Sequence, residues 1–293
     1  MAPQQAVQPV VVAVPGRGGL GWENHSTVLS PGMSRFDRLP AALRSALVQR
    51  RLLKVIAGLT NFDAASVECI SRAAGLGGAD VIDIACDPQL VELAAAVSGL
   101  PICVSAVDPE LFPAAVAAGA AMVEIGNYDA FYPLGRIFDA AEVLAITRRT
   151  RQLLPAVVLS VTVPHVLPLD QQEQLALDLV AAGADLIQTD GGTSARPLSA
   201  GSLGLIEKAA PTLAAAHSIS RALAAGGLEV PVLCASGLSA VTVPMAIAAG
   251  ASGVGVGSAV NRLSDAVAMV AVVRGLREAL GCPQGVPAPG THV

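Results

Sequence analysis

Aromatic and charged residues are scarce in this 293-residue chain, at 3% and 14% of the sequence. Only two of its 18 basic residues are lysines, no basic run occurs, and the formal net charge is -5, so no electrostatic footprint for nucleic acid is present. Long uninterrupted apolar runs are also missing, which excludes an obvious membrane span. Because 53% of the residues are hydrophobic, aliphatic side chains and alanine must build a large core.

Cysteine pairs with CxxC spacing are absent, and no histidine stands at metal-ligand spacing from the five cysteines, which are Cys69, Cys86, Cys103, Cys234 and Cys282. The sequence therefore predicts no metal site. The odd cysteine count favours a reducing compartment. The N-terminus lacks the basic region and long apolar stretch of a signal peptide, so we expect a cytoplasmic protein.

The texture of the chain changes near residue 36. Residues 1–35 are dominated by Pro, Gly and Gln without periodicity, which predicts a disordered extension. Residues 36–281 read as one folded domain, and residues 282–293 as a flexible tail.

One pattern repeats through the folded domain: a short β-rich run, a loop, and an Ala/Leu-rich helix. The eight runs are residues 52–58, 80–86, 101–107, 121–127, 156–165, 185–192, 230–237 and 252–258. Alternating strands and helices imply parallel βαβ units, and eight of them in about 250 residues predict a (β/α)8 TIM barrel. A doubly wound sheet is the competitor, but the first strand lacks a GxGxxG turn and two units would be left over. The segment "RFDRLPAALRSALVQRR" (residues 35–51) is expected to close the barrel floor.

Small residues follow the last two strands, in "CASGLSA" and "SGVGVGSAV". Loops after strands seven and eight of such barrels often hold a phosphate, through backbone N–H groups and helix N-termini. Glycines at 253, 255 and 257 share one strand face and leave room there; the alternative is that they relieve crowding at the barrel seam. The predicted phosphate or cofactor site comprises Ser236, Gly237, Leu238, Ser239, Gly255, Gly257 and Ser258.

Lys54 stands inside the first strand, "LLKVIAG", with Asp83 and Glu124 at similar depth in strands two and four. A buried lysine needs a carboxylate partner to keep its charge. The three residues therefore form a predicted catalytic cluster, in which Lys54 forms a Schiff base or transfers protons. A structural ion pair inside the barrel, or a lysine facing the floor, remains the alternative.

Other polar residues gather at strand ends. His165 is a candidate general acid or base, and Asp190 either orients a substrate hydroxyl or caps a turn. Gln188 shares the parity of Asp190 and is expected to point inward. Predicted substrate contacts are Asn61, Asn127, Thr162, Gly191, Gly192 and Thr193. Asp63 is an alternative helix cap near Asn61, and His217 is more simply structural.

Several blocks, among them "LKVIAGLTNFD", "VEIGNYDAFY", "TVPHVLPLDQQ" and "LIQTDGGTS", resemble the hypothetical chloroplast reading frame 23 family of cyanobacteria and algal plastids. The resemblance runs from about residue 36 to 261. It implies a phosphate-binding barrel and a cyanobacterial cytoplasm, but no reaction. Family members usually have TEG where this chain has "TDG", which makes Asp190 a shorter carboxylate, and they usually lack the first thirty residues. More distantly, the C-terminal end is similar to thiazole synthase, pyridoxal phosphate synthase and flavin-dependent barrels.

These observations favour an enzyme that acts on a small phosphorylated metabolite by lyase, aldolase or isomerase chemistry without a required cofactor. An FMN-dependent oxidoreductase, with the cofactor phosphate in the same loops, is the first alternative. A non-catalytic barrel that binds a phosphometabolite is the second. The Ala-rich helices would suit a homo-oligomer. Neither nucleic acid nor membrane is expected as a partner.

Overall fold

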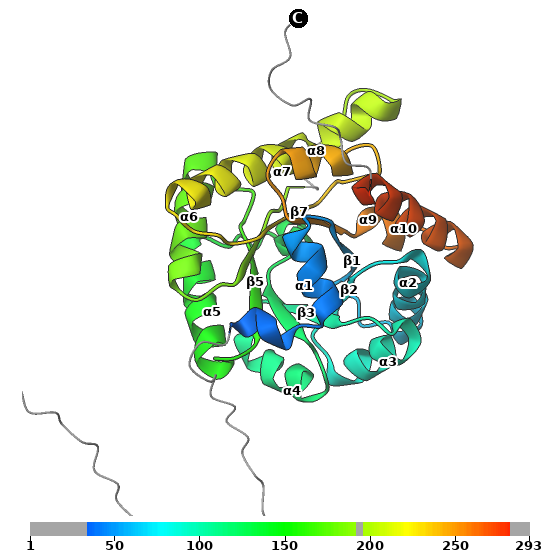
Figure 1. Ribbon diagram of the computed structural model, residues 1–293, viewed down its shortest axis with the longest axis horizontal. Helices are drawn as coiled ribbons and strands as arrows, with labels where there is room; N and C mark the ends of the chain where they lie inside the picture. Colours follow the sequence, from blue (N-terminus) through cyan, green and yellow to red (C-terminus); the bar gives the residue numbers. More distant parts are fainter. Residues whose placement is uncertain (1–33, 192–195, 282–293) are drawn as a thin grey trace, which may run out of the picture.

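Eight parallel strands close into a barrel in sequence order in the computed structural model, which describes residues 34–191 and 196–281 (Figure 1). This confirms the predicted TIM barrel. The predicted extension and tail fall largely or wholly outside the described residues. The strands are β1 Leu52–Gly58, β2 Val81–Ala85, β3 Ile102–Ala106, β4 Met122–Ile125, β5 Val158–Thr162, β6 Leu186–Gln188, β7 Val232–Ala235 and β8 Gly253–Val256.

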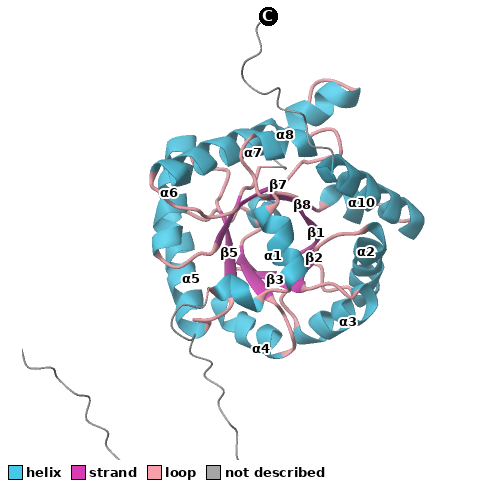
Figure 2. Cartoon of the chain, in the orientation of Figure 1, coloured by secondary structure: helices cyan, strands magenta, loops and turns pink. Residues whose placement is uncertain are grey.

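Helices surround the strand ring on the outside (Figure 2). The α-helices are α1 Ala41–Val48, α2 Ala64–Gly77, α3 Pro88–Ser98, α4 Phe112–Ala117, α5 Ala140–Leu153, α6 Leu169–Ala181, α7 Gly201–Ala225, α8 Val243–Ala248, α9 Ser258–Asn261 and α10 Ala266–Gly281. Short 3-10 turns are η1 Arg35–Arg38, η2 Pro109–Leu111, η3 Tyr128–Ala130 and η4 Tyr132–Leu134. None of the helices in the described part of the chain combines the length and apolarity that a membrane span requires.

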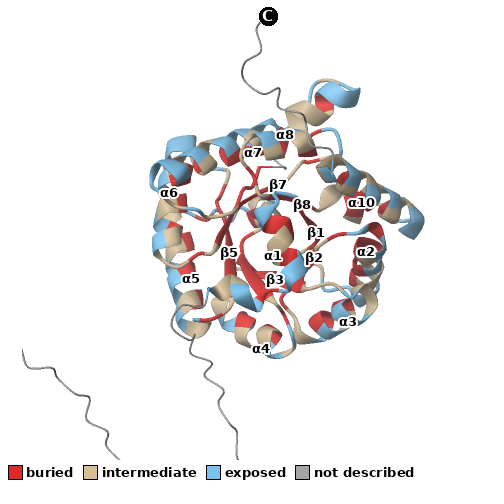
Figure 3. Cartoon of the chain, in the orientation of Figure 1, coloured by how far each residue is buried: buried red, intermediate tan, exposed pale blue. Residues whose placement is uncertain are grey.

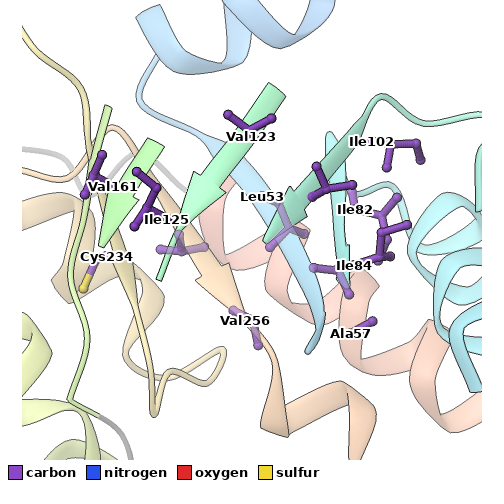
Figure 4. Packing of buried hydrophobic residues seen from close by; sticks show 14 of the residues in the cluster. Leu53, Ala57, Ile82, Ile84, Ile102, Val123, Ile125, Val161, Cys234 and Val256 are labelled. Atoms are coloured by element: carbon purple, nitrogen blue, oxygen red, sulfur yellow. The ribbon is translucent and has the colours of Figure 1, made fainter. Parts of the chain in front are cut away.

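The main core lies between the strands and the helices. Strand residues alternate inward and outward, and the outward ones are almost all Leu, Ile, Val, Ala or Cys, such as Leu53, Ile82 and Val161 (Figure 4). Burial is accordingly concentrated on the strands and on the inner faces of the helices (Figure 3). Two-sided burial explains why the strands read as nearly continuous apolar runs.

A second apolar cluster seals the amino-terminal end of the barrel. The helix α1 lies across that end, where its Leu43 and Leu47 pack against Leu52, Met122 and other inward residues of the first layer (Figure 1). The expected closure of the floor by this segment is therefore confirmed. Ligands must enter at the opposite end, where the strands terminate.

Two aspartates repeat one stabilising arrangement at the floor. Asp80, before β2, accepts the N–H of Leu53 and pairs with Arg277; Asp185, before β6, accepts the N–H of Leu159 and pairs with Arg151. Each carboxylate thus fixes the start of its own strand to the preceding one. Both arrangements lie at the amino-terminal end of the barrel, away from the end where the strands terminate.

Candidate active site

A cavity of about 200 Å³ opens at the carboxyl ends of the strands. Its floor includes Ile56, Thr162, Gln188 and Ala235, which point inward from four strands. Its walls come from the loops that follow the strands, including Asn127, Asp129, Asp190, Ser236 and Ser258. This is the end at which TIM-barrel enzymes carry their active sites.

A histidine between two aspartates borders this cavity. The Nδ1 atom of His165 lies 3.3 Å from Oδ2 of Asp190 and 3.7 Å from Oδ1 of Asp129. The hydroxyl of Ser236 donates to Oδ1 of Asp190 at 3.0 Å and lies 3.4 Å from Oδ2 of Asp129. The side chains of the histidine and the two aspartates are 3–14% exposed, so solvent screens their charges only partly.

The environment of His165 favours its protonated form. Burial lowers the pKa of His165, but the hydrogen bond to Asp190 and the negative charges of Asp190 and Asp129 outweigh it, so the pKa is raised. Because Nδ1 faces the carboxylates, Nε2 is the nitrogen left for proton transfer. The ring also packs edge-to-face against Tyr132, with centroids 4.9 Å apart, which restricts its orientation.

Two cationic side chains also line the cavity. Lys208 from α7 and Arg262, which follows α9, are both lining residues, together with Gly237, Gly257 and Ser258. Ser236 and Gly237 adopt positive φ angles of 79° and 70°. A Cβ on Gly237 would come within 2.8 Å of the backbone oxygen of Lys208, so glycine lets the loop approach the helix closely. Residues of the predicted phosphate loops and two cationic side chains therefore line the same cavity.

Lys54 lies below this cavity rather than in it. Its Nζ atom is 2.5 Å from Oε2 of Glu124 and 3.4 Å from Oδ2 of Asp83, and all three residues are fully buried. Ser105 donates to Asp83 and Ser160 donates to Glu124, which adds hydrogen bonds to both carboxylates. The three residues therefore lie together, as the parity of their strands predicted, and they form an ion-paired cluster inside the barrel. The catalytic role expected for them stays a prediction.

Burial and charge act in opposite directions on this cluster. Burial lowers the pKa of Lys54, but the charges of Glu124 and Asp83 raise it to a net value above its usual range. Burial raises the pKa of Asp83 to about 6, opposed by Lys54 and assisted by Glu124. A lysine held as the ammonium ion by a carboxylate is a poor nucleophile. Raising its ammonium towards the site, as expected from sequence, would require breaking both pairs.

The predicted site residues divide into several groups by position. The cavity is lined by Asn127, Thr162, Asp190, Ser236, Gly237, Gly257 and Ser258. His165 contacts the lining residue Asp190, and Glu124 contacts the lining residue Gln188. Gly192 and Thr193 lie outside the described residues. The roles assigned to all of them remain predictions.

The remaining predicted residues do not line the cavity, so their expected placement is corrected. Leu238 is buried in the main core, and Ser239 accepts and donates within the turn before α8 through Thr242. Asn61 contacts Ser66 at the start of α2. Gly191 is buried with a φ of 147°, near Pro211 of α7. Lys54, Asp83 and Glu124 also lie outside the lining, but their position one layer lower inside the barrel agrees with the sequence prediction.

Gly255 was expected in the phosphate site, but protein atoms occupy the space beside it. A Cβ there would lie 3.0 Å from Cβ of Ala235, 3.1 Å from Cδ1 of Ile56 and 3.3 Å from Oε1 of Gln188. At Gly253 a Cβ would lie 2.6 Å from Cβ of Leu52. Only Gly257 of the three borders the cavity. The glycines of β8 thus make room mainly for neighbouring side chains, as the crowding alternative held.

Four lining residues with charged or amide side chains escaped the sequence analysis: Asp129, Lys208, Asn261 and Arg262. Asp129 directly follows "GNY", which the sequence analysis had identified as the end of a strand. Its position in the sequence could therefore have indicated a site residue. Lys208 and Arg262 belong to a helix and to the residue after one, and no strand periodicity points to them. Lys208 is one of only two lysines in the chain, and this rarity was the only feature of the sequence that singled it out.

Comparison with known proteins identifies a family model and several relatives that are similar to the chain in sequence. The family model described as "Protein of unknown function (DUF561)" matches residues 39–284. The "Uncharacterized protein ycf23" of Pyropia yezoensis is 35% identical over 83% of this chain and 87% of its own length. That of Cyanophora paradoxa is 43% identical over 67% of this chain and 79% of its own. The resemblance found in the sequence blocks is therefore confirmed.

Solved structures are similar in fold at low sequence identity. A 3-hexulose-6-phosphate synthase superimposes with a TM-score of 0.54 and 18% identity, over 78% of this chain and 99% of its own. A (S)-3-O-geranylgeranylglyceryl phosphate synthase in complex with sn-glycerol-1-phosphate gives 0.54 and 14%, over 83% and 99%. An aldolase, QR15, gives 0.53 and 17%, over 79% and 93%. The neighbours are aldolase-type barrels, and at these identities they establish the fold only.

Proposed function

This chain belongs to the DUF561 family, whose curated relatives are the ycf23 proteins, and we propose that it is an enzyme that binds a small phosphorylated carbonyl compound and catalyses proton transfer on it. The observation that carries the proposal is a cavity that combines an acid–base cluster with two cations. The His165–Asp129–Asp190 cluster borders it, and Lys208 and Arg262 are among its lining residues.

The cationic part suits a phosphate. Arg262 and Lys208 would supply charge, and the loop residues Gly237, Gly257 and Ser258 would supply backbone N–H groups. Two of the similar barrels, the 3-hexulose-6-phosphate synthase and the synthase in complex with sn-glycerol-1-phosphate, are associated with phosphorylated compounds, which agrees with this assignment. A ligand phosphate at this position would direct the rest of a short molecule towards His165.

The histidine cluster suits enolisation. His165 would protonate the carbonyl oxygen through Nε2 while a carboxylate of the cluster removes a proton from the neighbouring carbon, which yields an enediol. Returning the proton to the former carbonyl carbon, while the other enediol hydroxyl loses its proton, gives an isomer. The same groups would serve a lyase if a carboxylate removed the proton of a β-hydroxyl group, because the adjacent C–C bond then breaks to give an aldehyde and the enediol, with His165 protonating the carbonyl oxygen. Asp190 would also fix the imidazole tautomer through Nδ1. Lys54 takes no part as a nucleophile in this scheme.

The cavity volume favours a small metabolite over FMN. Pockets that hold ligands of drug size usually measure about 300–1,000 Å³, whereas this one measures about 200 Å³. A flavin would need additional space for three fused rings. The visible spectrum of the purified protein tests the alternative, because a bound flavin would give the protein a visible absorption band.

Proton exchange provides the direct test. Dihydroxyacetone phosphate and free dihydroxyacetone are incubated with the protein in D2O, and loss of the carbon-bound proton signal is followed by NMR. We expect exchange of the phosphorylated compound only, abolished in His165→Gln and reduced at least about 10-fold in Arg262→Met. The exposed Arg148→Met is the matched control and should retain the wild-type rate.

Two results would count against the proposal. Equal handling of the two probes would remove the phosphate assignment. Binding of dihydroxyacetone phosphate without exchange, in a titration at several pH values, would favour the non-catalytic alternative over the enzyme.

A further inference from the structure

Gln188 presents an unpaired acceptor at the floor of the cavity. It ends β6, is 2% exposed and lines the cavity. Its Nε2 atom donates to Oε1 of Glu124 at 2.6 Å and lies 3.3 Å from the hydroxyl of Thr162. Its carbonyl oxygen Oε1 has no hydrogen-bond partner among the residues that the structure describes. Buried polar atoms are paired in most native proteins, so this atom needs an explanation.

The amide cannot turn over to satisfy that oxygen. Glu124 as a carboxylate only accepts hydrogen bonds, so the amide nitrogen, not the oxygen, must face it. Lys54 at 2.5 Å and the Ser160 hydroxyl at 2.8 Å both stabilise the negative charge of Glu124. The buried sequence of contacts from Lys54 through Glu124 to Gln188 therefore determines the direction in which Oε1 points.

The absence of a side chain at position 255 makes room for Oε1 itself. A Cβ at position 255 would lie 3.3 Å from Oε1, and the nearby lining residues Ile56 and Ala235 are apolar. In such surroundings the single acceptor favours a ligand that carries a hydrogen-bond donor. A ligand without a donor leaves Oε1 buried and unpaired, so its desolvation cost is not offset by a hydrogen bond.

We infer that Oε1 of Gln188 accepts a hydrogen bond from a hydroxyl group of the ligand, which makes the substrate a phosphorylated hydroxy compound with a hydroxyl at the cavity floor. The inference rests on the proposed function, because it takes the phosphate to lie near Lys208 and Arg262. Gln188 is then a specificity-determining residue. Lys54 and Glu124 are positioning residues that act through it.

Binding sites that hydrogen-bond a substrate hydroxyl reject analogues without that hydroxyl by about 10⁴-fold or more, because the polar groups of the site are then left unpaired. For a short flexible ligand we expect a smaller preference of at least about 10-fold. The phosphate contributes equally to both members of a matched pair. The ratio of their dissociation constants therefore isolates the hydroxyl contact.

The test compares sn-glycerol-1-phosphate with n-propyl phosphate, which has the same carbon count and no free hydroxyl. Dissociation constants are measured by NMR-detected titration of the full chain. We expect wild type to prefer the glycerol phosphate at least about 10-fold, and Gln188→Leu to bring the ratio to within about twofold of unity while still binding n-propyl phosphate. Arg262→Met should weaken both probes and leave the ratio unchanged.

Glu124→Gln tests the positioning role, because an amide at 124 lets the Gln188 amide turn over. Its ratio should also fall towards unity, and a purely structural role would lower the melting temperature without changing the ratio. If Glu124→Gln fails to fold, Gln188→Leu still decides the inference. Equal binding of the two probes by wild type would overturn the inference about Gln188 and leave the proposed function standing. Binding of neither probe, or no effect of Arg262→Met, would overturn the proposed function beneath it.

Discussion

The barrel contains two groups of the same composition, a nitrogen base between two carboxylates, at different depths. Lys54 lies between Asp83 and Glu124 in a fully buried layer, and His165 lies between Asp129 and Asp190 beside the cavity. Residue type alone does not separate the group that we propose to be catalytic from the group that forms an ion pair in the barrel interior. The difference lies in access to ligand and in whether the base can change its protonation state near neutral pH.

The buried group should be the more important for stability. Replacing Lys54 by Met leaves two carboxylates in the barrel interior without a countercharge, and breaking a buried pair in this way costs about 3–5 kcal/mol. Urea unfolding should show that loss in the free energy of unfolding. Arg72→Met, which removes an exposed i,i+4 pair with Glu68, is the matched control and should cost at most about 0.5 kcal/mol.

A Lys54→Met variant of nearly wild-type stability would show that the interior charges are not held as an ion pair. It would also reopen the interpretation of Lys54 as a catalytic amine. Loss of D2O exchange in a folded variant of this kind would be the corresponding sign.

The space around the buried group gives the next largest effect. Gly255→Ala would put a methyl group at 3.0–3.3 Å from Ala235, Ile56 and Gln188. Overpacking of a tight interior usually costs about 1–3 kcal/mol, and we expect a loss in that range by urea unfolding. A stability within error of wild type would mean that the layer is more loosely packed than these distances imply.

The His165 group should instead make stability depend on pH. Its pKa is raised in the folded protein, so the protonated form is favoured by folding. This contribution is fully present below the unfolded pKa, about 6.5, and is lost as pH rises through the raised folded value. Unfolding free energies of wild type and Asp190→Asn, measured from pH 5 to 9, should therefore converge at the alkaline end.

Direct titration of His165 by NMR provides the check on this assignment. Its pKa should fall in Asp190→Asn, because the hydrogen bond to the Asp190 carboxylate and the negative charge of that residue, the two largest causes that raise it, are both lost. An unchanged pKa would mean that Asp129 or another group determines the protonation of the ring.

The architecture could be predicted from the sequence because each strand carries a local signal. All eight observed strands fall within the predicted runs, since two-sided burial leaves short aliphatic segments bounded by glycine and polar residues. Period-two parity was sufficient to bring Lys54, Asp83 and Glu124 together. Depth was not predictable: the parity that puts Lys54 inside the barrel is shared by Ile56, and only the second residue reaches the cavity.

Helix-borne site residues were invisible for a different reason. Whether Lys208 or Arg262 reaches the cavity depends on how α7 and α9 sit over the strand ends, which is a tertiary property. Gly255 and Gly257 illustrate the same limit. They share a face and a residue type, but a Cβ at Gly255 would be crowded at 3.0–3.3 Å, whereas a Cβ at Gly257 would have only ordinary contacts of 3.4–3.6 Å.

Those two glycines also give the smallest expected effect and the finest comparison of the two layers. A Cβ at Gly257 would lie 3.4 Å from the backbone oxygen of Ile56 and 3.6 Å from Asn261, both ordinary contacts, and the φ of -108° is open to alanine. Gly257→Ala should therefore change the free energy of unfolding by less than about 0.5 kcal/mol. Because the methyl group stands at the cavity wall, it should nevertheless weaken binding of sn-glycerol-1-phosphate. A variant that loses stability but not affinity would reverse the assignment and place the ligand away from β8.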